Sequence, residues 1–434
     1  MIEILLNDRA YEQDIRELLM AFYPGETFSY EPVQGAQCSV EGVIDGSRRW
    51  FSLKIISHSP LEIPEFPKEA GEELEEELCR IEDPGEVDYD NRTETKSRIK
   101  RRLYVLLVLR TGKLLPWGTL TGIRPTKILM TRLDEGMTAG EAALYMKRNY
   151  FTGRDKIDLA VRTALYERQL LKTVDCKTGY SLYIGIPFCP STCYYCSFPS
   201  YPLAIHGIWV EEYLQALFKE IRYAGSRGAI KGKHLQTVYV GGGTPTTLSA
   251  GQLDRLFTFM EENLDLSFLQ EITVEAGRPD SITREKLLVL RDHGIKRISI
   301  NPQTMKQATL DLIGRRHTVE EICETFYMAR ELGFDNINMD IILGLAKETP
   351  QDVEETLSRI GELSPDNLTV HTLAVKRAAR LNTNRDEYAG LEACGVQEML
   401  RVSREFAREN NYHPYYLYRQ KNMAENLENI GYAR

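Results

Sequence analysis

From Tyr180 onward, short apolar-rich runs alternate with longer amphipathic segments, and this rhythm constrains the fold more than any other feature of the sequence. Repeated strand–helix–strand units favour parallel strands that are joined by right-handed crossovers. The expected strands are Leu182–Pro187, Thr237–Thr244, Ile272–Ala276, Arg297–Gln303, Asn336–Gly344 and Asn367–Val375. Six such units predict an α/β protein whose sheet forms a barrel or an open, partial barrel.

Local signals mark the ends of the intervening helices. Ser249 and Thr318 each stand three residues before a Gln or Glu, which is the pattern of a capping box at a helix N-terminus. Thr349 precedes a proline, and proline favours the first helical position. Gly294 and Gly333 follow expected helix ends, where glycine adopts the left-handed conformation easily. These signals support the alternation of strands and helices.

Several of the expected strands alternate polar and apolar residues, whereas parallel strands that are covered on both faces are usually apolar throughout. Successive side chains of a strand point to opposite faces, so the apolar set packs on the helices and the polar set lines the interior. The polar set is Glu271, Thr273, Glu275, Ser299, Asn301, Gln303, Asn336, Asn338, Asp340, Thr369 and His371. The pattern predicts a polar cavity whose chemistry lies at the C-terminal ends of the strands.

The rest of the sequence divides into an N-terminal module, a helical connection and a C-terminal extension. We expect an α+β module with an acidic segment at 1–96, a helical connecting region at 97–175, the partial barrel at 176–380 and a helical extension at 381–434. The turn-rich segment Leu115–Lys127, LPWGTLTGIRPTK, is interpreted as a structural loop. The elements expected in the N-terminal module are strands at Ile2–Leu6, Cys38–Ile44 and Trp50–Ile56 and a helix at Tyr11–Phe22.

The charge of the chain is unevenly distributed. The net charge is −9, and the stretch Glu62–Glu94 holds 14 acidic residues against three basic ones. We interpret this stretch as a solvated segment, and the acidic balance argues against nucleic acid as the main partner. No apolar run is long enough for a membrane span, and the N-terminus lacks the features of a secretory signal. The sequence therefore predicts a cytoplasmic protein.

Three of the eight cysteines form a compact motif, C-x3-C-x2-C, at Cys189, Cys193 and Cys196. Three thiolates do not complete the four-cysteine tetrahedron of structural zinc. They can bind three irons of a [4Fe–4S] cluster and leave the fourth iron open. An open iron is what S-adenosylmethionine (SAM) needs if its amino and carboxylate groups are to chelate the cluster. A zinc site and incidental thiols are the alternatives, which this position at a barrel mouth does not favour.

A run of glycines, Gly241–Gly243, ends the second expected strand and is followed by Thr244 and a proline. Glycines let a ligand approach the backbone closely, although a short glycine run is more often a tight turn. Because this run ends at the same face as the cysteine motif, we interpret it as part of a ligand site.

At these residues the sequence resembles the radical SAM superfamily and, more closely, the oxygen-independent coproporphyrinogen III oxidase family. The N-terminal region with the Leu115–Lys127 segment resembles the branch called coproporphyrinogen dehydrogenase HemZ. The resemblance implies that Gly241–Gly243 hold the methionyl part of SAM, that Glu275 and Asp340 bind ribose hydroxyls, and that Arg315 binds the carboxylate. It also implies that Tyr195 or Phe198 packs near the adenine. Further cofactor contacts are expected at Tyr183, Thr244 and Gln303.

The resemblance implies a tetrapyrrole substrate and an electron donor such as flavodoxin or ferredoxin. Oxidative decarboxylation of coproporphyrinogen III is the leading expectation. Two positions depart from the oxidases: Gly185 replaces a histidine, and Phe198 replaces a further cysteine, as in the haem-chaperone branch. A haem chaperone and a radical transferase acting in anaerobic haem breakdown therefore remain alternatives.

The expected substrate contacts are one histidine and two cations. The alternation of the last strand points His371 into the interior. Lys376 and Arg377 follow that strand, and the propionates of a tetrapyrrole would need such cations. A solvated basic helix face is the alternative interpretation of the two cations. No catalytic side chain is assigned.

Overall fold

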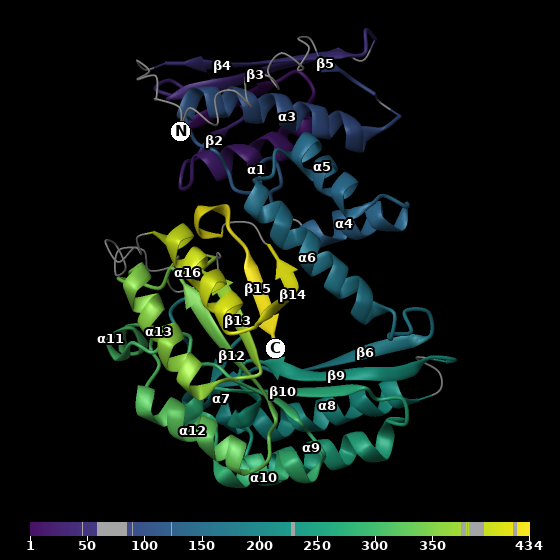
Figure 1. The fold of residues 1–434 in the computed structure, drawn as a ribbon, viewed down its shortest axis with the longest axis vertical. Coiled ribbons are helices and arrows are strands. Elements are labelled where there is room, and N and C mark those ends of the chain that lie inside the picture. Colours follow the sequence, from purple (N-terminus) through teal and green to yellow (C-terminus); the bar gives the residue numbers. More distant parts are fainter. Residues whose placement is uncertain are drawn as a thin grey trace. The chain divides into compact units, whose positions relative to one another are not determined.

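The computed structural model describes residues 1–45, 47–58, 85–88, 90–122, 124–226, 231–374, 379, 381, 395–419 and 423–434. The chain forms two compact units (Figure 1). The first comprises Met1–Ala164 and Tyr418–Leu427, and the second comprises Leu165–Leu417 and Glu428–Arg434.

The first unit contains a five-stranded sheet in the order β2-β1-β3-β4-β5. Strand β1 is parallel to β2 and β3, and β4 is antiparallel to β3 and β5. Helices α1 and α3 bury their apolar residues against the sheet, so this unit combines a mixed sheet with helices. The elements are β1 (Ile2–Leu6), α1 (Glu12–Phe22), β2 (Phe28–Ser29), β3 (Cys38–Asp45), β4 (Trp50–Ser57), β5 (Gly85–Glu86), α3 (Arg92–Thr111), α4 (Pro125–Asp134), α5 (Ala139–Tyr150) and α6 (Arg154–Leu171).

The segment Leu115–Lys127 packs inside the first unit. The Trp117 ring is fully buried, and the Arg419 guanidinium lies 5.1 Å from its centroid. Arg419 Nη1 donates to the carbonyl oxygen of Leu120 at 2.8 Å. Gly118 has φ +55°, and a Cβ there would lie 1.9 Å from the carbonyl oxygen of Tyr150. The unusual composition of this segment therefore serves close backbone packing around a buried arginine.

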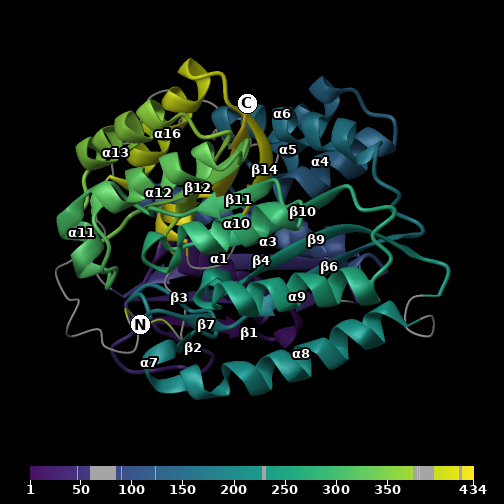
Figure 2. The same cartoon turned by 90° about the horizontal axis from the view of Figure 1, so that it is seen from below.

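The second unit is built on an eight-stranded, curled sheet in the order β14-β15-β13-β12-β11-β10-β9-β6. The six strands from β6 to β13 are parallel, as the sequence predicts. Figures 1 and 2 show α8, α9, α10, α12 and α13 along one face of this sheet. Its strands are β6 (Gly179–Ile186), β9 (His234–Gly242), β10 (Glu271–Gly277), β11 (Arg297–Ile300), β12 (Asn336–Leu343), β13 (Asn367–Thr372), β14 (His413–Tyr418) and β15 (Asn429–Ala433).

A short sheet and the helices complete the second unit. Strands β7 (Phe188–Cys189) and β8 (Tyr201–Pro202) pair with each other. The capping boxes at Ser249, Thr318 and Thr349 are present, and Gly294 and Gly333 have positive φ as predicted. The helices are α7 (Leu203–His206), α8 (Val210–Gly225), α9 (Ala250–Asn263), α10 (Arg284–Asp292), α11 (Gln307–Leu312), α12 (Val319–Glu331), α13 (Pro350–Leu363) and α16 (Val396–Glu409).

The predicted alternation holds along the central strands. In β12, Ile337, Met339 and Ile341 are fully buried, whereas Asn338 and Asp340 are half-buried. The apolar set thus packs under the helices, and the polar set covers the other face of the curled sheet.

The structure differs from the sequence prediction at the sheet edge and in β11. The last region contains α16 but also β14 and β15, and β15 pairs antiparallel with β13, so the sheet has eight strands and not six. This pairing satisfies the backbone N–H and C=O groups along the edge of β13, which would otherwise be unpaired. Strand β11 ends at Ile300, because Pro302 lacks an N–H group and Gln303 adopts φ +70°.

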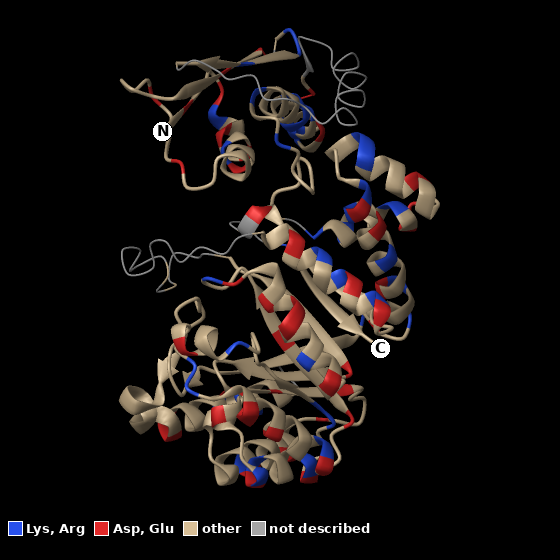
Figure 3. Cartoon of the chain, turned by 60° about the vertical axis from the view of Figure 1, so that its left-hand side comes forward, with Lys and Arg blue, Asp and Glu red and all other residues tan. Residues whose placement is uncertain are grey.

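Charges of both signs are interspersed along the helices (Figure 3). Most of the acidic stretch Glu62–Glu94 lies outside the described residues. Within the described part of the chain, no helix is long and apolar enough to cross a membrane.

Candidate functional site

The three cysteines of the motif follow the C-terminal end of β6: Cys189 ends β7, and Cys193 and Cys196 lie on the loop between β7 and β8. Cys189 and Cys193 are buried, and Cys196 is partly exposed. Pairing of β7 with β8 closes the loop, since Phe188 pairs with Tyr201. The loop is therefore a defined structure that presents three thiols at one end of the sheet.

Two other strand–helix connections hold this loop in place through Tyr194. Its backbone N–H donates to the carbonyl oxygen of Ile313 at 3.2 Å, and its hydroxyl accepts from the N–H of Ala346 at 3.1 Å. Ile313 follows α11 and Ala346 follows β12. The cysteine loop is thus tied to connections that emerge at the C-terminal ends of β11 and β12, where the sequence predicts the chemistry.

The glycine run packs directly against the start of the cysteine loop. The N–H of Gly243 donates to the carbonyl oxygen of Ile186 at 2.8 Å, and the N–H of Thr244 donates to that of Phe188 at 2.8 Å. A Cβ on Gly243 would lie 2.6 Å from the Phe188 carbonyl oxygen and 3.0 Å from the Cys189 sulfur. Only glycine fits at this approach of the two connections.

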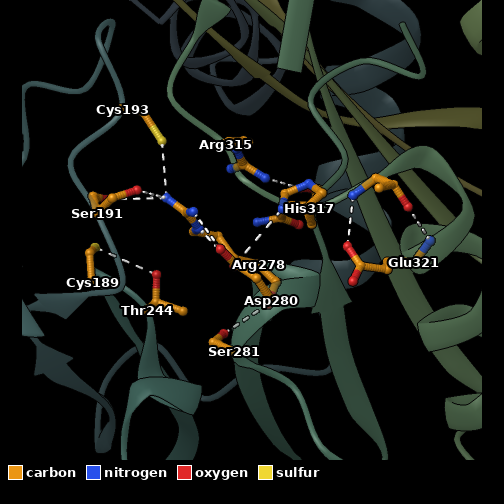
Figure 4. Close-up of polar contacts among 12 residues, drawn as sticks. Cys189, Ser191, Cys193, Thr244, Arg278, Asp280, Ser281, Arg315, His317 and Glu321 are labelled. Atoms are coloured by element: carbon orange, nitrogen blue, oxygen red, sulfur yellow. Dashed lines mark hydrogen bonds and ion pairs between the residues drawn. The ribbon is translucent and has the colours of Figure 1, made fainter. Parts of the chain in front are cut away.

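Arg278 is a site residue that the sequence analysis missed (Figure 4). It directly follows β10 and is 3% exposed. Its Nη1 lies 3.6 Å from the sulfur of Cys193 and donates to the Ser191 hydroxyl at 2.9 Å, and its Nε and Nη2 donate to the Asp280 carboxylate at 3.0 and 2.6 Å. The available signal was its position at the C-terminal end of a strand in the polar-lined sheet.

Tyr183, Tyr239 and Glu275 share the polar face of β6, β9 and β10. The two tyrosine rings are stacked, with centroids 5.8 Å apart. The Tyr239 hydroxyl donates to Glu275 at 2.5 Å. Burial raises the pKa of Glu275 to about 7, with a smaller contribution from the negative charge of Asp340, although the Tyr239 hydroxyl opposes the rise. This carboxyl therefore changes its charge near neutral pH.

Asp340 and His371 lie on the same face, on β12 and β13. Asp340 Oδ1 accepts from Asn338 at 2.6 Å, and its Oδ2 lies 3.7 Å from His371 Nε2. Burial would raise the pKa of Asp340, but His371 and the hydrogen-bond donors Asn338 and Thr369 lower it overall. Asp340 is an ionised acceptor, in contrast to Glu275.

Gln303 and Arg315 bring further polar groups to this end of the sheet. Gln303 is 7% exposed, has positive φ, and its side-chain oxygen has no hydrogen-bond partner. Arg315 is 5% exposed; it donates to the backbone oxygen of Asn301, and its Nη2 contacts the Tyr195 hydroxyl at 3.3 Å. Strained backbone with unsatisfied buried polar atoms is typical of ligand sites.

The donor set fits a [4Fe–4S] cluster with SAM. Among the described residues, no three His, Cys, Asp or Glu side chains converge on one metal ion. A [4Fe–4S] cluster does not need such convergence, because each thiolate binds a different iron. The three thiols fit such a cluster. The close approach of Gly243 and the unpartnered oxygens of Asn301 and Gln303 fit a polar ligand bound to it.

Of the remaining predicted residues, two are largely exposed and two lie outside the described part of the chain. Phe198 and Tyr183 are 64% and 61% exposed, so neither is enclosed by the protein itself. Lys376 and Arg377 lie outside the described residues. Their assignment to tetrapyrrole propionates stays a prediction from the sequence.

The chain is similar in sequence to several known proteins. The radical SAM superfamily pattern matches residues 183–360. The chain is 41% identical over 369 residues to the oxygen-independent coproporphyrinogen-III oxidase-like protein HemZ of Bacillus subtilis, covering 84% of this chain and 73% of that protein. It is 36% identical over 196 residues to the heme chaperone HemW of Lactococcus lactis, covering 45% of this chain and 49% of that protein.

Among solved structures, coproporphyrinogen III oxidase HemN from Escherichia coli matches with 30% identity and a TM-score of 0.49. The match covers 58% of this chain and 56% of that one. The chain thus spans about half the length of the oxidase and chaperone relatives that it matches.

Proposed function

We propose that this chain, which belongs to the oxygen-independent coproporphyrinogen-III oxidase-like family of the radical SAM superfamily, is a radical SAM enzyme that acts on a tetrapyrrole. Its proposed reaction is the oxidative decarboxylation of coproporphyrinogen III propionates to vinyl groups, which yields protoporphyrinogen IX. The observation that carries the proposal is the packing of the three-cysteine loop against Gly243, beside a sheet face lined with polar side chains.

The residues of the chain have distinct roles in this proposal. Cys189, Cys193 and Cys196 hold the cluster. Gly241–Gly243 and Thr244 offer backbone groups to the methionyl part of SAM, and Arg315 binds its carboxylate. When bound and reduced by a donor such as flavodoxin or ferredoxin, the cluster and SAM would supply the radical chemistry that removes a hydrogen atom from the substrate.

The polar face of the sheet is proposed to orient SAM. Asp340 and Glu275 accept hydrogen bonds from the ribose hydroxyls, and the unpartnered oxygen of Gln303 takes a further cofactor donor. Tyr183 contacts the cofactor, and Tyr195 or Phe198 packs near its adenine. Because most of these groups come from strand ends of one sheet, their positions are fixed before the ligand binds.

The substrate is proposed to bind through its propionates. Lys376 and Arg377 would pair with the carboxylates, and His371, 3.7 Å from Asp340, would contact the tetrapyrrole. After hydrogen is removed, loss of carbon dioxide and one electron to an external acceptor leaves the vinyl group. The protein holds the reacting propionate and excludes water while these bonds change.

A haem-binding chaperone is the second candidate function. Phe198 stands where the oxidases carry a further cysteine, and Gly185 replaces a histidine. A relative with 36% identity is the heme chaperone HemW. In this alternative the chain keeps the cluster but carries haem without turnover.

Anaerobic turnover distinguishes the two candidates. The full chain with a reconstituted cluster is incubated with dithionite, SAM and either coproporphyrinogen III or haem, and the tetrapyrrole is analysed by mass spectrometry. The proposed enzyme removes one carbon dioxide and two hydrogens per reacting propionate, and Cys193→Ala abolishes this product. Unchanged coproporphyrinogen together with stoichiometric haem binding would support the chaperone instead.

A further inference from the structure

An ion pair between Arg278 and Asp280 lies next to the cysteine loop, and Arg278 is its buried member. The Arg278 side chain is 4% exposed and that of Asp280 is 21% exposed, and the guanidinium makes a two-pronged contact with the carboxylate. Arginine keeps its charge at all accessible pH values, so this positive charge is permanent. A buried guanidinium is costly unless most of its donors are satisfied, and here the partners come from two separate segments.

The second segment that Arg278 contacts is the cysteine loop itself. Its Nη1 donates to the backbone oxygen of Ser191 at 3.1 Å and to its hydroxyl at 2.9 Å, and it lies 3.6 Å from the Cys193 sulfur. The Ser191 hydroxyl donates in turn to the carbonyl oxygen of Gly314 at 3.0 Å. Arg278 therefore joins the end of β10 to residues 191–193 (Figure 4). The same residues are tied to Gly314, which precedes Arg315.

Two further buried groups, His317 and Arg315, lie close to the ion pair. His317 is fully buried, its Nδ1 lies 3.9 Å from Asp280 Oδ1, and neither ring nitrogen has a hydrogen-bond partner. Arg315 is buried nearby and adds a second permanent positive charge that acts on Asp280. Because Arg278 and Arg315 are buried, their charges act more strongly on neighbouring groups than surface charges do.

We propose that Arg278 is a positioning residue whose charge, balanced by Asp280, sets how readily the bound cluster accepts an electron. The inference rests on the proposed function, since it requires a cluster at Cys193. Reduction adds negative charge to the cluster, and a hydrogen-bonded cation beside a ligating sulfur stabilises that charge. Arg278 therefore favours the reduced form, and Asp280 limits this effect.

Two neutralising substitutions separate electrostatic tuning from a purely structural role. Arg278→Gln keeps a planar amide with N–H donors but removes the positive charge, so the cluster becomes harder to reduce. Asp280→Asn leaves the Arg278 charge without its counter-ion, so the cluster becomes easier to reduce. A residue that only supports the loop would lower cluster content in both variants without shifting the potential in opposite directions.

The experiment is a redox titration of the reconstituted full chain, followed by electron paramagnetic resonance, with iron content measured in parallel. At the wild-type midpoint we expect the reduced-to-oxidised ratio to fall at least about tenfold in Arg278→Gln, which corresponds to about 59 mV for one electron. The ratio should rise in Asp280→Asn. Arg284→Gln is the matched control, because Arg284 pairs with Glu331 at the surface and should leave the midpoint unchanged.

Each outcome bears on the proposal. Opposite shifts support it, whereas equal midpoints or shifts of the same sign in Arg278→Gln and Asp280→Asn overturn it. If Arg278→Gln holds no cluster, Arg278→Lys takes its place; it keeps the charge, so a wild-type midpoint together with the rise in Asp280→Asn supports the proposal, and any other result overturns it. Failure of the wild-type chain to assemble a cluster would instead overturn the proposed function.

Discussion

The hydroxyl of Thr244 lies 3.5 Å from the sulfur of Cys189, although 55 positions separate the two residues in the sequence. Thr244 follows β9, and Cys189 ends β7 in the connection that follows β6, so the contact joins the connections of the neighbouring strands β6 and β9. Gly243 makes this contact possible, because its backbone lies against the Phe188 carbonyl group. The glycine run and the cysteine motif are thus one structure, and changing either should affect the other.

Gly243→Ala should reduce both cluster content and SAM affinity. The added Cβ would lie 2.6 Å from the Phe188 carbonyl oxygen, so one of the two connections must move. Iron analysis and calorimetry with SAM check this on the reconstituted chain. Gly251→Ala in α9 is the control, since its Cβ would meet nothing within 4 Å. If Gly243→Ala binds iron and SAM normally, the proposed packing is not required.

Replacing Cys189, Cys193 or Cys196 by Ala should remove most of the bound iron and the broad visible absorbance, because an iron would lose its protein ligand. Iron analysis and absorbance spectra of anaerobically reconstituted protein measure this. Cys323→Ala should behave as wild type, because Cys323 lies in α12, away from the motif. A full iron complement in the three motif variants would show that the cluster is not bound there.

Asp340→Ala should weaken SAM binding by about 1–3 kcal/mol, the range expected when buried hydrogen-bonding groups lose their partner. Asp340 is the ionised acceptor of the polar face and also contacts His371. Isothermal calorimetry under anaerobic conditions gives the affinity. Asn336→Ala, at the other end of the same strand and on the same face, should bind SAM normally. Equal affinities for the Asp340 variant and the wild type would remove Asp340 from the cofactor site.

Glu275→Gln should stabilise the unliganded chain at pH 8 but not at pH 4. The pKa of Glu275 is about 7 in the folded chain against 4.5 in the reference state. Ionisation therefore opposes folding: the cost is absent below pH 4.5, grows between 4.5 and 7, and is complete above 7. Each pKa unit corresponds to about 1.4 kcal/mol, so the gain is a few kcal/mol at most. Urea unfolding across this pH range measures it, and a pH-independent difference would contradict the shifted pKa.

Arg419→Lys should lower the free energy of unfolding by about 2–4 kcal/mol, because several hydrogen bonds of a buried charge are lost. The guanidinium of Arg419 reaches the carbonyl oxygens of Leu120, Asn426 and Leu427 at once, which a single ammonium group cannot do. Urea unfolding followed by tryptophan fluorescence tests this. Arg408→Lys, on the exposed side of α16, should unfold like the wild type. Equal stability of Arg419→Lys would mean that the carbonyl groups find other donors.

Local sequence patterns were sufficient to predict the central sheet. The polar alternation along β10 to β13 and the caps at Ser249, Thr318 and Thr349 are short-range signals, so the six parallel strands were predicted correctly. Strands β14 and β15 were missed because their place depends on the free edge of β13, which lies far away in the sequence.

The candidate site likewise contains motifs that the sequence predicts and one residue, Arg278, that it does not. The cysteine motif and the glycine run are each a short, continuous stretch of sequence, so each could be identified directly. The contact of Arg278 with Cys193 spans 85 positions and depends on how two connections meet. The position of Arg278 at a strand end could have marked it as a candidate, but no local pattern reports its contact with Cys193.

The first unit is built from two separate stretches of the chain, which affects how it forms during biosynthesis. This unit takes residues Tyr418–Leu427 into its structure, including the buried Arg419. The ribosome releases the chain from its N-terminus, so residues 1–164 emerge long before this partner segment exists. Until that segment has been translated, the carbonyl group of Leu120 lacks its Arg419 donor and the Trp117 ring lacks its guanidinium neighbour, so the first unit completes these contacts only late in synthesis.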